Sequence, residues 1–113
     1  TNLPHAARSA RIDNLAEHGI AWPVVTNSGG KGPAIAALAA RAEAPVVFID
    51  DSPSQIRSAK AHAPAVTPVH FVGCDFARSV IPAAEGVGEG LRDWDAAADA
   101  IRTAVFNPGR DRA

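Results

Sequence analysis

The stretch Pro45-Val46-Val47-Phe48-Ile49-Asp50-Asp51-Ser52-Pro53 decides the fold. Its unbroken run of apolar β-formers is typical of a parallel strand that is buried on both faces. The run ends at two aspartates, and Ser-Pro is a common beginning for a helix. The stretch therefore predicts a central strand over 45–50, with a helix over 53–63 directly after it.

The rest of the chain alternates in the same way around this unit. Gly19 is a natural stop for the first helix, and Pro23 and Pro68 restrict their strands to an edge or an early position. Short connections between alternating elements indicate an α/β fold with a parallel sheet. We expect further helices over 4–18, 33–42 and 93–106, and further strands over 22–26 and 66–72.

These elements account for a single domain over residues 1–106. Residues 73–92 carry alternating glycines and no clear period, so we expect an irregular loop region there, with a frayed tail over 107–113. Trp22 and Trp94 are interpreted as packing residues, and His70 as a half-buried structural residue within its strand.

Composition excludes several classes of protein. The 113 residues are 47% hydrophobic and 20% charged, as in a globular domain, and the net charge of −1 gives no reason to expect a nucleic acid or an anionic membrane as partner. Cys74 is the only cysteine, which excludes an internal disulfide and a cysteine-only zinc site. No apolar run approaches the ~18 residues of a membrane span, so a cytoplasmic location is expected.

Polar side chains follow the expected strands at their carboxyl ends, where open α/β sheets bind their ligands. They are Thr1-Asn2, then Asn27-Ser28 with Lys31 close behind, and then Asp50-Asp51. Adjacent aspartates repel each other unless a cation or a lysine stands between them, and carboxylate oxygens suit Mg²⁺. The pattern predicts a phosphate and magnesium site. The alternative is a helix cap with a first-turn acid at 50–53, and a solvated surface charge at Lys31.

In their order and spacing, three groups of residues resemble the motifs of the haloacid dehalogenase superfamily of hydrolases. They are Thr1-Asn2, Lys31 with Pro33, and the 46–52 stretch followed by Ile56. The resemblance implies a Rossmann-like three-layer α/β/α parallel sheet and a Mg²⁺-dependent phosphatase that acts on a small phosphorylated metabolite. Thr1, with Asn2, would bind the phosphoryl oxygens, and Lys31 would neutralise charge. Asp50 and Asp51 would hold Mg²⁺, and Asn27 and Ser28 would be secondary contacts. Gln55 stands where many members carry a further aspartate.

The family's nucleophile, an aspartate in an Asp-x-Asp motif after the first strand, has no counterpart here. Asp93-Trp94-Asp95 has the letters but follows no apolar strand, and is interpreted as a helix cap. The chain has no methionine, even at position 1, so we expect it to be the C-terminal part of such an enzyme, cut within the second motif. Such a fragment would be inactive and marginally stable. Its sheet would lack the strand that carries the nucleophile, which in the family lies between the strand that ends at Asp50 and the strand that ends at Thr1. The sheet would then keep a gap there or close into a different pairing.

Two other classes of protein remain open. One is a non-catalytic receiver-like or nucleotide-binding α/β module with an acidic metal pocket, although receiver domains place their acidic pair after the first strand. The other is a fragment that is completed by a strand from a partner chain.

Overall fold

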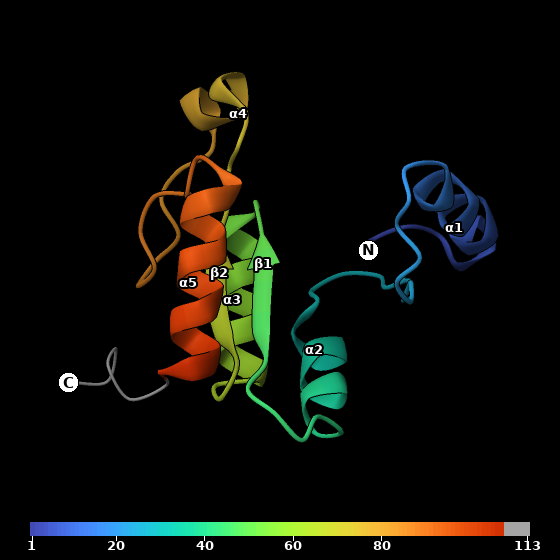
Figure 1. The fold of residues 1–113 in the computed structure, drawn as a ribbon, viewed down its shortest axis with the longest axis horizontal. Helices are drawn as coiled ribbons and strands as arrows, with labels where there is room; N and C mark the ends of the chain where they lie inside the picture. Colours follow the sequence, from blue (N-terminus) through green and yellow to red (C-terminus); the bar gives the residue numbers. More distant parts are fainter. Residues whose placement is uncertain (108–113) are drawn as a thin grey trace.

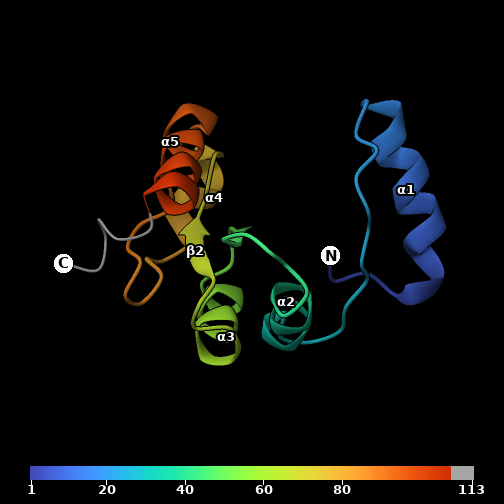
Figure 2. The same cartoon turned by 60° about the horizontal axis from the view of Figure 1, so that its bottom comes forward.

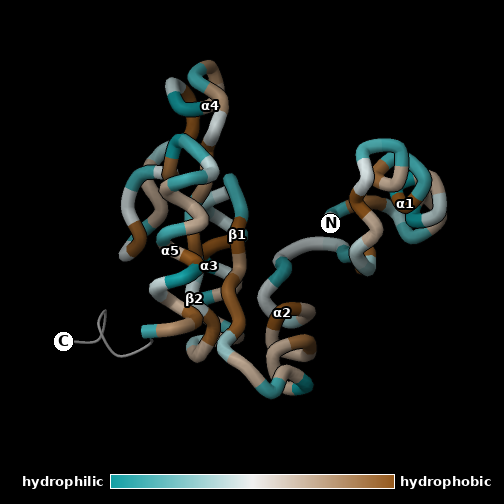
Figure 3. The backbone as a smooth tube through the Cα atoms, viewed as in Figure 1, coloured by the Kyte–Doolittle hydropathy of each residue, from teal (hydrophilic) through white to brown (hydrophobic). Residues whose placement is uncertain are grey.

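Two parallel strands form the sheet at the centre of the computed structural model, which describes residues 1–107. β1 (Val47–Asp50) pairs with β2 (Thr67–His70), and the register places Asp50 opposite His70. The predicted class, a mixed α/β domain with parallel strands, is confirmed. Figure 3 shows that β1 is hydrophobic along most of its length and turns hydrophilic at its carboxyl end.

Two helices lie on opposite sides of the strand pair. α3 (Pro53–His62) covers one face, and α5 (Trp94–Phe106) covers the other (Figure 2). α2 (Gly32–Ala39) packs against α3 and does not cover the sheet itself. The core lies between α2, α3 and the strands, where Ile35, Ala59, Ala63 and Val66 are buried. The expected helices after Gly30 and Ser52 are thus confirmed, each within a few residues of its predicted end.

The N-terminal residues form a separate arm. η1 (His5–Ala7) and α1 (Arg8–Glu17) are followed by Gly19 at a φ of 73° and then by an extended segment. No residue of α1 is buried, and the helix stands away from the strand pair in both views (Figures 1 and 2). The predicted helix over 4–18 is therefore confirmed apart from its short 3₁₀ first turn.

The strand predicted over 22–26 is wrong. Its residues are extended but belong to no sheet. Their one pairing is with the chain start: Thr1 donates its amino group to the Val25 carbonyl, and the Asn27 N–H donates to the Thr1 carbonyl, both at 2.9 Å. This is the bond pattern of a parallel bridge. It stops after one residue pair because the chain turns away from residues 25–27 into η1 and α1.

Residues 73–92 are more ordered than expected. They contain α4 (Asp75–Val80), which the sequence analysis missed, and a turn closed by a bridge between Ala84 and Gly88. Leu91 adds a one-residue parallel bridge to the outer side of β2 through Phe71. Asp93 accepts the Ala96 N–H at 2.8 Å, so its interpretation as a helix cap is confirmed. The predicted frayed tail lies, apart from Asn107, outside the described residues.

Among residues 1–107, no strand lies beside the edge of β1 that faces away from β2. The carbonyls of Val46 and Asp50 accept hydrogen bonds from the β2 side. Backbone groups alternate along a strand, so Val47 and Ile49 point theirs to the opposite edge. Within residues 1–107 no backbone or side-chain group hydrogen-bonds to that edge. In the same part of the chain, no helix has the length and apolar character that crossing a membrane requires.

Candidate functional site

Asp50 stands at the carboxyl end of β1 with a buried carboxylate, 6% exposed. Its Oδ2 lies 2.5 Å from the Lys31 Nζ, and its Oδ1 accepts the Ser52 N–H at 2.8 Å. Asp50 therefore fixes the backbone of Ser52 just before α3, and the Ser52 hydroxyl makes no capping bond, contrary to expectation. The acidic pair thus combines the two readings of the sequence. Asp50 holds the turn that leads into α3 and also pairs with a lysine.

Lys31 reaches Asp50 because α2 begins in close contact with α3. The Lys31 N–H donates to Gln55 Oε1 at 2.8 Å, and the Gly32 N–H donates to Ser58 Oγ at 3.0 Å. A Cβ on Gly32 would lie 2.2 Å from the Ser58 carbonyl oxygen, so only glycine fits this approach. Gln55 and Ser58 were not predicted to shape the site. Their i, i+3 spacing on α3, which puts them on one face, was the available signal.

Asn2 and Asn27 come together beside this lysine. Asn2 donates to the Gly29 carbonyl at 2.8 Å, and Asn27 donates to Asn2 Oδ1 at 3.1 Å. These amides are occupied in holding the loop that leads to Lys31. Ser28, the other expected secondary contact, lines an open hollow of about 620 Å³ together with Asn2, His5 and Asn27.

Thr1 lies near the lysine but faces elsewhere. The pKa of its amino group is lowered, first by burial and then by the positive charge of Lys31, while Asp50 raises it. Its side-chain hydroxyl has no hydrogen-bond partner in residues 1–107, and the residue lines a hollow with Arg11 and Leu15. The structure thus places Thr1 within the electrostatic reach of Lys31 and Asp50, but not in a hollow with Asp50.

Asp51 has an exposed carboxylate, and no cation of the described chain pairs with it. Its backbone is fixed by His70, whose side chain is almost completely buried. The Nε2 of His70 lies 3.0 Å from the Asp51 carbonyl, and its Nδ1 lies 3.1 Å from the Gly88 carbonyl. His70 therefore ties the acidic turn to the loop that returns before α5. His70 is thus a structural residue, as predicted, but it is 2% exposed and not half-buried, and the sequence does not predict its position behind Asp51.

The acidic pair lines a hollow of about 390 Å³, whose other walls are mostly apolar. Trp94 and Phe71 stack there, with ring centroids 4.4 Å apart and planes inclined by 29°. Trp22 is 80% exposed, so its interpretation as a packing residue is wrong, whereas Trp94 packs on Phe71 and still leaves 65% of its surface exposed. The hollow is lined by Ile49, Asp50, Asp51, Phe71, Val72, Gly73, Cys74, Ala77 and Trp94.

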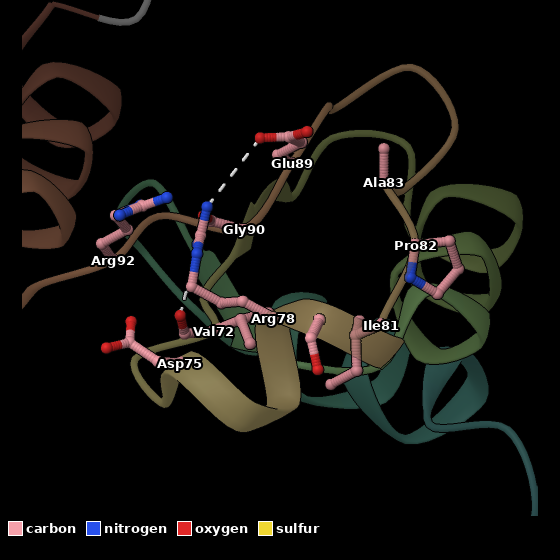
Figure 4. Close-up of a pocket in the computed structure, with 10 residues that line it drawn as sticks. Val72, Asp75, Arg78, Ile81, Pro82, Ala83, Glu89, Gly90 and Arg92 are labelled. Atoms are coloured by element: carbon pink, nitrogen blue, oxygen red, sulfur yellow. Dashed lines mark hydrogen bonds and ion pairs between the residues drawn. The ribbon is translucent and has the colours of Figure 1, made fainter.

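Arg78 lies next to that hollow and hydrogen-bonds to Val72, one of its lining residues. One of its guanidinium nitrogens donates to the carbonyls of Val72 and Gly90, and another lies 3.8 Å from a Glu89 carboxylate oxygen. Figure 4 shows the Arg78 side chain extending toward Glu89, beside a neighbouring hollow of about 410 Å³. With its donors engaged in this way, Arg78 holds the chain before α5 against the end of β2.

The donors available for a divalent cation are the two adjacent carboxylates. No group of three or more His, Cys, Asp and Glu side chains converges anywhere in residues 1–107. Mg²⁺ commonly binds through one or two carboxylates and keeps several waters, so the exposed Asp51 with Asp50 beside it is a donor set that fits this ion. Asp50 would bind such a cation while it also remains paired with the Lys31 ammonium group.

Comparison of the chain with protein-family models, with curated proteins and with solved structures found no match.

Proposed function

We propose that this chain carries the phosphate- and magnesium-binding part of a hydrolase of the haloacid dehalogenase type, which acts on a small phosphorylated metabolite. The observation that carries the proposal is the contact between Lys31 and Asp50 at the carboxyl end of β1, with the free carboxylate of Asp51 next to it. The motif order along the sequence supports the same assignment.

Each residue has a definite task in this proposal. Lys31, held by Gln55 and Asp50, presents its ammonium group to a phosphoryl oxygen. The Thr1 hydroxyl, and the amide N–H of Asn2 that is not used by the Gly29 carbonyl, are the further donors of the proposed phosphate site. Asp50 and Asp51 hold Mg²⁺, which when bound offsets the negative charge of the phosphoryl group. Asn27 and Ser28 support the loop. The proposed chemistry still needs an attacking carboxylate and a proton donor for the leaving group. Because the sequence offers no counterpart of the family's nucleophile motif, we propose that the isolated chain binds phosphate without turning over esters.

The finer description of the fold belongs to the same proposal. We infer a Rossmann-like α/β/α arrangement in which β1 is an inner strand. The helices on both sides of the strand pair support this inference, as does the parallel bridge between Thr1 and the 25–27 segment.

Binding measured by calorimetry and NMR tests the proposal. We expect Mg²⁺ to bind the wild-type chain and to increase its affinity for inorganic phosphate. Asp51→Asn should weaken Mg²⁺ binding, and Lys31→Met should weaken phosphate binding. Asp95→Asn, which removes an exposed acid on α5, is the matched control and should change neither. Mg²⁺ binding that survives both Asp50→Asn and Asp51→Asn would refute the proposal.

Hydrolysis of p-nitrophenyl phosphate tests the part of the proposal that concerns turnover. No Mg²⁺-dependent activity above background is expected from this chain. Activity that persists through purification and disappears in Asp50→Ala would show that the attacking group lies within the chain.

A second candidate function rests on the unpaired edge of β1. An isolated two-stranded sheet is marginal in water, and an apolar strand with a free edge is a template for another strand. We propose that an extended, apolar strand from a partner chain could pair there with Val47 and Ile49. A peptide of that kind should raise the melting temperature of the chain, and a version with proline at alternate positions should not.

A further inference from the structure

An aromatic wall stands beside the acidic pair in the hollow of about 390 Å³. Phe71 and Trp94 form the wall, and their rings are stacked. Asp50 and Asp51 lie at the other side of the same hollow. A space of this size is within the range of small-molecule sites, in which apolar walls and a few polar groups fix the ligand.

The backbone around the wall holds the rings in place. A Cβ on Gly73 would lie 3.1 Å from the Phe71 ring, so this glycine leaves room for the ring. The N–H of Leu91 donates to the His70 carbonyl at 2.8 Å, and Asp93 caps the helix that begins at Trp94. The chain thus fixes Trp94 beside Phe71 while most of the tryptophan remains open to a ligand.

The charges of the hollow restrict what can stack there. Its lining includes two carboxylates and no lysine or arginine. Lys31 is engaged with Asp50, and Arg78, which borders the hollow at Val72, is engaged with the Val72 and Gly90 carbonyls and with Glu89. A second anionic group on the ligand would therefore meet Asp51 without compensation, whereas an uncharged ring would gain contact with Trp94.

We propose that this hollow receives the leaving group of the phosphate ester, and that this group is an uncharged planar ring, as in an aryl or other flat cyclic alcohol. The inference rests on the proposed function, since Lys31 and the acidic pair would hold the phosphoryl end. It goes further than that function because contact with Trp94 and Phe71 would select phosphate esters of flat cyclic alcohols.

Fluorescence in a Trp22→Phe background tests the inference, because Trp94 is then the only tryptophan in the chain. The probes are phenyl phosphate, methyl phosphate and phenol, each titrated with Mg²⁺ present. We expect phenyl phosphate to change the Trp94 emission and to bind about fivefold more tightly than methyl phosphate, as aromatic stacking typically contributes. Trp94→Leu, followed by calorimetry, should remove that preference and leave the affinity for methyl phosphate unchanged.

The outcomes separate the two proposals. Equal affinities for phenyl and methyl phosphate, both reduced by Lys31→Met, would overturn the aromatic subsite and leave the proposed function standing. Phenol that binds as tightly as phenyl phosphate would overturn the subsite as well, because the ring would then bind without the phosphoryl end. If neither phosphate binds, both proposals fail. The comparison of probes on the Trp22→Phe chain decides the question even if Trp94→Leu does not fold.

Discussion

Lys31→Met is expected to destabilise the chain, because it leaves the buried carboxylate of Asp50 without its cation. Asp50 is 6% exposed and Lys31 is 23% exposed at the side chain. Breaking a fully buried ion pair costs about 3–5 kcal/mol, and an exposed pair contributes about 0–1 kcal/mol. The Ser52 N–H still serves one carboxylate oxygen after the substitution. We therefore expect a loss of about 2 kcal/mol.

Urea unfolding followed by circular dichroism measures this loss. For a chain of this size, 2 kcal/mol lowers the midpoint by about 1 M or more. The double variant Lys31→Met/Asp50→Asn removes the buried charge together with its partner and should recover at least about 1 kcal/mol. Asp51→Asn is the matched control: it removes an exposed like charge beside Asp50 and should leave the midpoint unchanged or slightly higher.

Two results would refute this reasoning. A loss below about 0.5 kcal/mol for Lys31→Met would mean that the pair behaves as a solvated surface contact. A coupling near zero in the double variant would mean that the cost comes from the lysine stem and not from its charge. If the single variant is too unstable to measure, trimethylamine N-oxide in all samples restores a measurable baseline.

The structure leads to three further predictions. In β1, the amides of Val47 and Ile49 should exchange with deuterium faster than that of Phe48, because they face the unpaired edge; equal protection would show that another group covers it. Gly32→Ala should cost at least about 1–3 kcal/mol in urea unfolding, as its methyl group would collide with the backbone of α3; an unchanged midpoint would contradict the close approach of α2. The pKa of the Thr1 amino group is lowered from 8.0 by burial and by Lys31, so its protonation opposes folding. Stability should therefore rise with pH up to about 8 more than in the Nα-acetylated chain, and identical pH profiles would contradict this.

The parts of the fold that local sequence determines were predictable. The apolar run into Asp50 and the helix after Ser52 follow from residue types over a short window, as does the Asp93 cap. The segment over 22–26 has equally good β-forming residues, yet a strand exists only where a neighbour supplies its hydrogen bonds. Its neighbour is Thr1 alone, and periodicity carries no information about that.

The candidate site shows the same division. Lys31 and Asp50 could be expected near each other, because both follow expected strands at their carboxyl ends. The residues that fix them could not be expected, since their roles depend on tertiary distances. The sequence relates Gln55 only to the further aspartate of the resembling family, and in the structure its side-chain oxygen accepts the Lys31 N–H. His70 was assigned to the strand interior, and it proves to hold the Asp51 peptide.

These contacts place Lys31 where the N-terminal arm joins the strand pair and α3. The arm over 1–28 reaches the strand pair through the loop over 29–31. Asn2 and Asn27 hold this loop from the arm, and Gln55 and Asp50 hold it from the strand pair and α3. In Figure 1 the arm and the N-terminus lie on the side of β1 that faces away from β2. The charge of Lys31 therefore serves both the proposed phosphate site and the orientation of the arm. A strand that paired with the free edge of β1 would lie on this same side of the strand pair. It would change the surroundings of Lys31, so strand pairing at this edge and phosphate binding at the site should be coupled in this protein.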